Sequence, residues 1–167
     1  MGKVLVVYFS AQGHTKRVAE MIAGELGADI FEIQPSEPYY DEDLDWTDNG
    51  SRVVREHSNE AEREMELVQL RPDNWAEYDT IILGYPIWWG IAAWPVDAFL
   101  RGNDFTNKIV IPFATSHSSP LGDSDRLLAA KASGMREWRE GIRFSQDAGE
   151  DVVKAWLGEL GLVSSEE

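Results

Sequence analysis

The chain has 167 residues, which is the size of one domain with a sizeable hydrophobic core. It contains no cysteine, so disulfide frameworks and thiolate chemistry are excluded. Aspartate and glutamate number 30 against 15 lysines and arginines, and the resulting charge of −15 argues against a surface that binds nucleic acid or an anionic membrane.

The first predicted strand covers residues 4–9 (VLVVYF), a continuous apolar and β-branched run typical of a strand buried on both faces. A polar loop follows at residues 10–15 (SAQGHT), and Val18, Ile22 and Leu26 then recur at helical spacing. A helix that begins here presents unpartnered backbone N–H groups, a place where an anion is favoured. Two hydroxyls and a glycine in the loop suit a phosphate.

The same loop admits a plainer interpretation, in which Ser10 or Thr15 caps the helix and no ligand binds. Strand-to-helix turns that contain a glycine such as Gly13 are common. The loop by itself therefore leaves phosphate binding and simple capping equally open.

An acidic stretch interrupts the alternation of strands and helices. Residues 35–66 contain eleven acidic residues and three arginines, a net charge of −8. We expect residues 35–74 to form a partly helical insertion or crossover within the domain, because a long unstructured loop is unusual in a compact domain. Its helix should begin after Asp48 or Ser51 and run to about Met65. The cluster of Asp41, Glu42, Asp43 and Asp45 lacks the spacing of a calcium loop, so we expect it to be solvated surface and not a metal site.

The second and third strands are expected over residues 29–33 and 78–85. Pro86 has no N–H for a sheet ladder and marks the expected end of the third strand. Residues 87–90 (IWWG) would then form a loop at the carboxyl edge, where open α/β sheets bind ligands. Either tryptophan alone is better explained as closing the core, whereas beside a phosphate loop one of them could form the wall of a planar ring site.

The remaining residues continue the alternation, which is typical of a doubly wound α/β sheet. A helix should begin at Pro95, a residue favoured in a first turn, and end near Gly102. The elements expected after it are a strand at 108–113, a polar loop at 114–120, a helix at 121–131, a charged edge strand at 135–144 and an amphipathic helix at 147–160.

Three blocks of sequence carry a resemblance to a known family. They are S-A-Q-G-H-T at residues 10–15, Y-P-I-W-W-G at 85–90 and P-F-A-T-S at 112–116. Together they resemble the flavodoxins, in particular a flavodoxin-like branch with Y-P-I-W-W-G. Gln12 and His14 depart from the commonest form of the first block, S/T-x-T-G-x-T.

The resemblance implies a single flavodoxin-like domain over residues 1–167 that binds flavin mononucleotide (FMN). Its fold would be α/β, a flavodoxin-like doubly wound five-stranded parallel sheet of order 2-1-3-4-5 with helices on both faces. The branch usually has a proline where this chain has Ala93, so the helix expected at Pro95 could start elsewhere.

The resemblance also implies roles for single residues. Trp89 would lie over the isoalloxazine ring, and the Gly90 peptide would turn to accept a hydrogen bond from flavin N5–H, although an ordinary turn glycine is an equal alternative. His117 is the candidate catalytic residue, as a proton donor, although a histidine in a polar loop is more often only solvated. The expected FMN-binding residues are Ser10, Gln12, Gly13, His14, Thr15, Pro86, Ile87, Trp88, Trp89, Gly90, Thr115, Ser116 and His117.

Three functions remain open on the sequence. The first is an electron carrier whose acidic surface steers a basic redox protein partner. The second is an FMN-dependent oxidoreductase that passes hydride from NAD(P)H to a small quinone-like acceptor, and the third is a non-catalytic protein that keeps the fold without flavin. The charge of −15 disfavours adding negative charge to a bound flavin, which favours the carrier.

Two further expectations concern other ligands and location. Neither G-x-G-x-x-G nor G-K-[S/T] follows the first strand, which argues against a dinucleotide-binding enzyme and a P-loop protein. The sequence shows no leader segment and no apolar run of membrane-spanning length. We therefore expect a cytoplasmic protein without nucleic-acid or membrane partners.

Overall fold

The computed structural model describes residues 3–10, 13–45, 47–59, 65–88, 91–116, 135–139, 141–145 and 147–161. Its centre is a sheet in which the strands follow the order β2-β1-β3-β5-β6, all paired in parallel. These strands are β1 (Lys3–Tyr8), β2 (Asp29–Glu32), β3 (Tyr78–Trp88), β5 (Ile109–Ser116) and β6 (Glu137–Trp138). The short β7 (Ile142–Ser145) also pairs with β5 in parallel. The predicted parallel sheet of order 2-1-3-4-5 is confirmed, with β5 in the fourth place and β6 and β7 sharing the fifth.

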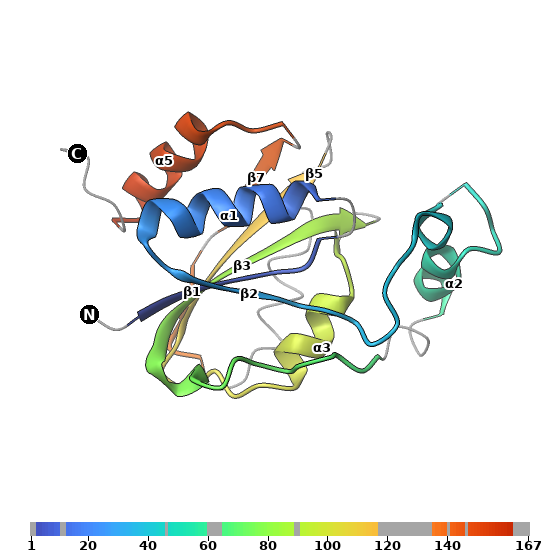
Figure 1. Ribbon diagram of the computed structural model, residues 1–167, viewed down its shortest axis with the longest axis horizontal. Coiled ribbons are helices and arrows are strands. Elements are labelled where there is room, and N and C mark those ends of the chain that lie inside the picture. The colour runs from blue at the N-terminus through green and yellow to red at the C-terminus, as the bar shows by residue number, and fades with distance from the viewer. Residues whose placement is uncertain are drawn as a thin grey trace.

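Helices cover both faces of this sheet (Figure 1). The helices α1 (His14–Leu26) and α5 (Glu150–Glu159) lie side by side on one face, and α3 (Pro95–Arg101) lies on the other. Each face has its own apolar cluster, one packed under α1 and α5 and the other under α3. This is the doubly wound arrangement expected from the alternation of elements.

The central strand β1 shows why the sheet is buried on both sides. Leu5 and Val7 belong to the cluster under α3, whereas Val6 and Tyr8 belong to the cluster under α1 and α5. Successive side chains of a strand point to opposite faces, so a continuous apolar run fills both layers. The prediction that the first strand is buried on both faces is confirmed.

The acidic stretch at residues 35–66 extends beyond the carboxyl ends of the strands, where α2 stands apart from α1, α3 and α5 (Figure 1). It contains η1 (Asp41–Leu44) and α2 (Arg52–Ser58). The prediction of a helix to about Met65 is wrong, because the backbone becomes extended at Asn59. Ser51 occupies the N-cap position, yet its side chain makes no cap bond and its Oγ is buried without a partner.

One acidic residue of this stretch is not solvated. Glu56 on α2 is only 6% exposed and accepts hydrogen bonds from three side chains. In the cluster expected to be solvated, Asp41, Glu42 and Asp45 are exposed and Asp43 is half-buried. A short helical turn, η3 (Trp75–Glu77), leads directly into β3.

The boundaries of the third strand differ from the prediction. The strand β3 continues through Pro86 to Trp88, so Ile87 and Trp88 are not in a loop. Pairing with β1 ends at Gly84, and beyond this point one side of β3 needs no N–H donor, which explains why a proline is tolerated. The Pro86 carbonyl accepts a 3.0 Å hydrogen bond from the Ala93 N–H, and β3 turns into an antiparallel hairpin with β4 (Ile91–Ala92).

Other strand boundaries also differ from the predicted ones because of pairing between strands. The strand β5 continues three residues past the predicted end to Ser116, because β7 pairs with this extension. The predicted edge strand at 135–144 is instead the two short strands β6 and β7. The helix α3 begins at Pro95 as predicted, despite Ala93. The helix predicted at 121–131 lies outside the described residues.

Candidate functional site

The first turn of α1 has the geometry expected of a phosphate loop. Gly13 occupies the N-cap position with φ 93°, a left-handed conformation that favours glycine. Its N–H donates to Ser10 Oγ at 3.0 Å, and nothing lies within 4 Å of the position that a Cβ would take. The turn is therefore open on the side where the backbone N–H groups of His14 and Thr15 begin the helix. These donors and the open space fit a phosphate group.

Thr15 does not cap the helix. Its hydroxyl forms a 2.7 Å hydrogen bond with the Thr115 hydroxyl, and the two side chains are 1% and 2% exposed. This bond ties the start of α1 to the end of β5, two elements 100 residues apart. Each hydroxyl carries one hydrogen, and either of the two can be the donor in this bond.

The hairpin formed by β3 and β4 lies next to this pair, since β3 runs between β1 and β5 in the sheet. Trp88, at the end of β3, packs in a cluster of rings with Phe9, Tyr39 and Trp94, at centroid distances of 5.7, 5.4 and 4.8 Å. All three contacts are edge-to-face, the arrangement that aromatic rings prefer. Trp88 thus fills a half-buried core position, the plainer of the two interpretations of a tryptophan here.

The end of β5 supplies two more predicted residues, Thr115 and Ser116, and both side chains are buried. The Ser116 hydroxyl accepts a 2.9 Å bond from Arg143 Nε, while its carbonyl accepts a 3.1 Å bond from Arg143 Nη2. Arg143 lies on β7, so these two bonds fasten the edge strand to the end of β5. No feature of the sequence singled out Arg143 for this task.

A cavity of about 360 Å³ opens beside Ser10. It is lined by the end of β1 and by the segment that follows β2, including Phe9, Ser10, Pro35, Pro38 and Tyr39. Burial and the hydrogen bond to the Glu56 carboxylate raise the pKa of Tyr39 well above its ordinary value. Its hydroxyl therefore stays protonated at neutral pH and donates to that carboxylate.

The structure brings one group of predicted residues together and leaves another group undescribed. Ser10, Gly13, His14, Thr15 and Thr115 meet at the carboxyl edge of the sheet. Pro86, Ile87, Trp88 and Ser116 belong to the strands behind that edge. Gln12, Trp89, Gly90 and His117 lie outside the described residues. Sequence reasoning missed Tyr39, Glu56, Trp94 and Arg143.

Known proteins resemble this chain in sequence and in fold. A sequence profile described as Flavodoxin matches residues 3–160. This chain belongs to the flavodoxin family. The resemblance inferred from the three sequence blocks is thereby confirmed. No curated protein gives a significant match.

Solved structures of other proteins are similar to this flavodoxin-family chain in sequence and fold. A candidate flavoprotein from Bacteroides uniformis is 39% identical, with a TM-score of 0.85 over 94% of this chain and 98% of that one. Another from Bacteroides eggerthii is 34% identical, also with a TM-score of 0.85, over 96% and 99% of the two chains. A flavoprotein from Lactobacillus acidophilus, solved in complex with FMN, is 23% identical with a TM-score of 0.66 over 93% and 99%, which supports the fold alone.

No helix in the described part of the flavodoxin-family chain combines the length and the apolar character needed to cross a bilayer.

Proposed function

We propose that this flavodoxin-family protein binds FMN at the carboxyl edge of its sheet and serves as an electron carrier. The observation that carries the proposal is the hydrogen bond between Thr15 and Thr115, which joins the first turn of α1 to the end of β5. It brings an open helix N-terminus and two strand ends to one edge, where ligands of open α/β sheets bind. A ligand with a phosphate at one end and a planar ring at the other suits such an edge.

The phosphate would be held by the first turn of α1. The backbone N–H groups of His14 and Thr15 would donate to its oxygens, and the helix dipole favours its negative charge. The Ser10 and Thr15 hydroxyls stand on either side of Gly13 along the chain. The positive φ of Gly13 and the empty space beside it leave room for the phosphate.

The ring would lie between the loops that follow β3 and β5. When bound, FMN accepts and donates electrons through its isoalloxazine ring. In this proposal Trp89 covers one face of the ring, the Gly90 peptide lies beside N5, and Thr115, Ser116 and His117 approach the pyrimidine edge. Trp88 supports this arrangement from behind, because its ring packs among Phe9, Tyr39 and Trp94.

The charge distribution favours a carrier over a two-electron reductase. A net charge of −15 opposes further negative charge on a bound flavin, so complete reduction should be difficult. Asp41, Glu42, Asp45 and Asp48 are exposed, and they belong to the stretch that extends beyond the carboxyl ends of the strands, at the same end of the molecule as the start of α1 (Figure 1). A basic redox protein would be attracted to that end.

Two measurements test the proposal in sequence. The purified protein should be yellow, and the flavin that it releases on denaturation should be FMN. A protein that neither carries nor takes up FMN would refute the cofactor assignment. Steady-state oxidation of NAD(P)H in the presence of a quinone should be slow compared with electron transfer to a basic haem protein. Rapid quinone reduction would instead identify an FMN-dependent NAD(P)H oxidoreductase.

A further inference from the structure

Glu56 is a buried carboxylate with an unusual set of partners. Its Oε1 accepts hydrogen bonds from the Tyr39 hydroxyl and from Trp94 Nε1, the latter at 2.9 Å. Its Oε2 accepts from Arg52 Nε at 3.1 Å. A buried carboxylate is retained in a fold only where hydrogen bonds and an opposite charge compensate its lost hydration. Each donor here comes from a different segment: the stretch after β2, the start of α3, and α2 itself.

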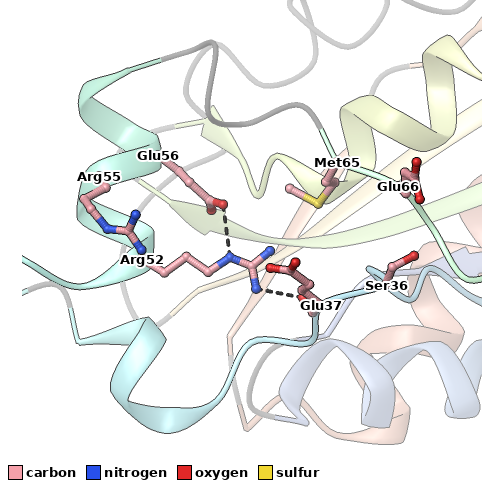
Figure 2. A pocket seen from close by; sticks show the side chains of 7 residues that line it. All are labelled: Ser36, Glu37, Arg52, Arg55, Glu56, Met65 and Glu66. Atoms are coloured by element: carbon pink, nitrogen blue, oxygen red, sulfur yellow. Dashed lines mark hydrogen bonds and ion pairs between the residues drawn. The ribbon is translucent and has the colours of Figure 1, made fainter.

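Arg52 extends the network to the backbone of the segment that follows β2. Figure 2 shows its guanidinium between Glu56 and the Glu37 carbonyl, at the edge of a cavity of about 630 Å³. Arg52 Nη1 donates to the carbonyls of Glu37 and Pro38 at 2.7 and 3.2 Å, and its Cζ lies 3.8 Å from the centre of the Tyr39 ring. The guanidinium therefore neutralises the carboxylate and at the same time fixes the Tyr39 ring in place.

The two rings bound by the carboxylate enclose Trp88. The ring of Tyr39 lies 5.4 Å from that of Trp88 and the ring of Trp94 lies 4.8 Å from it, measured between centroids. Trp88 is paired with Ile91 across the β3–β4 hairpin, so only two residues join them. Trp88 directly precedes residues 89 and 90 in the sequence.

We propose that Glu56 is a positioning residue for the flavin ring. It holds Tyr39 and Trp94 against Trp88 and thereby fixes the residue that directly precedes 89 and 90 in the chain. The inference rests on the proposed function, because it assigns those two residues to the ring. It gives α2 of the acidic stretch a role inside the molecule, separate from any attraction of basic partners.

The network makes a specific prediction about which part of FMN is affected. A residue that acts on the ring should change the affinity for FMN and for riboflavin by the same factor, because riboflavin has the ring and lacks the phosphate. Loss of a hydrogen bond to a buried charged group should weaken both by about tenfold in Glu56→Gln, whose amide would face Arg52 with a donor. The flavin that remains bound should fluoresce more strongly, because the ring wall is less well ordered.

Two more variants make the experiment decisive. Tyr39→Phe removes one donor and keeps the ring, so it should weaken both flavins in the same direction even if Glu56→Gln folds poorly. Glu37→Gln removes the same charge from the same cavity and keeps the backbone carbonyl that Arg52 contacts, so it should leave both affinities within about twofold. Dissociation constants, flavin fluorescence and the unfolding temperature of the flavin-free protein should be measured for each.

The outcomes separate this inference from the proposed function. If Glu56→Gln and Tyr39→Phe lower only the unfolding temperature, while flavin affinity and fluorescence stay at wild-type values, Glu56 is merely structural and the inference is overturned. A larger loss for FMN than for riboflavin also overturns it, since the effect would then lie at the phosphate. A wild-type protein that binds neither flavin refutes the proposed function and the inference together.

Discussion

Replacing Gly84 with alanine tests how tightly β3 packs against the layer formed by α1 and α5. A Cβ at this position would lie 2.6 Å from both Cε1 and Cε2 of Phe113, and closer still to Cζ. Carbon atoms pack at about 3.5–4.0 Å, so the ring would have to retreat by roughly 1 Å or more. Phe113 is fully buried, with the rings of Phe144 and Trp156 at centroid distances of 6.0 and 6.2 Å. The ring cannot move without displacing these neighbours.

The expected cost follows from these contacts. Overpacking of a core costs about 1–3 kcal/mol, and the reduced freedom of the unfolded chain offsets roughly 0.5 kcal/mol of it. We expect Gly84→Ala to lower the free energy of unfolding by about 2 kcal/mol, measured by urea denaturation of the flavin-free protein. Gly24→Ala is the matched control, because Gly24 is exposed within α1 and nothing lies within 4 Å of its Cβ position. This control should raise the free energy of unfolding by about 0.5–1 kcal/mol.

A second substitution tests whether the Phe113 ring causes the loss of stability in Gly84→Ala. Phe113→Leu removes the atoms that the new Cβ would meet, so the double variant with Gly84→Ala should be more stable than the sum of the single effects predicts, by about 1 kcal/mol. A change below about 0.5 kcal/mol for Gly84→Ala alone would refute the argument.

Three further predictions concern the cofactor, pH and salt. Thr15→Ala should weaken FMN by about tenfold more than riboflavin, because only FMN has a phosphate for the first turn of α1 to bind; equal losses would contradict that site. Burial, together with the charges of Glu32 and Glu20, raises the pKa of Tyr8 to about 12. The unfolded tyrosine ionises first, so the free energy of unfolding should fall as the pH rises from about 10 towards 12, and Tyr8→Phe should flatten that fall. If residues 35–66 attract a basic redox protein, its association rate should drop steeply with added salt, whereas a rate indifferent to salt would leave solubility as their role.

The sequence predicts those parts of the fold that depend on local pattern. The continuous apolar runs of β1 and β3 can be buried only if both faces of the sheet are covered, which already implies helices on both sides. Pro95 starts α3 where a proline is best tolerated, and the departure at Ala93 does not shift it. In each case the information lies within a few residues of the feature that it specifies.

The boundaries at the carboxyl edge were wrong because they depend on partners distant in sequence. Pro86 ends a strand only where both sides of the strand need donors, and here β1 has already separated from β3. Ser116 belongs to β5 because β7 pairs with it. The pattern around either residue gives no sign of these neighbours, so the local rule for proline and the polar character of Thr115 and Ser116 both favoured a loop.

The support of the candidate site is non-local in the same way. Residues 35–66 contain eleven acidic side chains, and their spacing does not distinguish Glu56 from the others. Two of its three donors, Tyr39 and Trp94, lie 17 and 38 residues away, so only the packed chain selects which carboxylate is buried. Once α2 packs here, the Tyr39 hydroxyl, the Trp94 indole N–H and the Arg52 guanidinium all need an acceptor. A buried donor or acceptor without a partner would lose its hydration with no hydrogen bond in return. Small polar loops after parallel strands therefore reveal where a ligand should lie, whereas the residues that hold those loops in place can be found only from the folded structure.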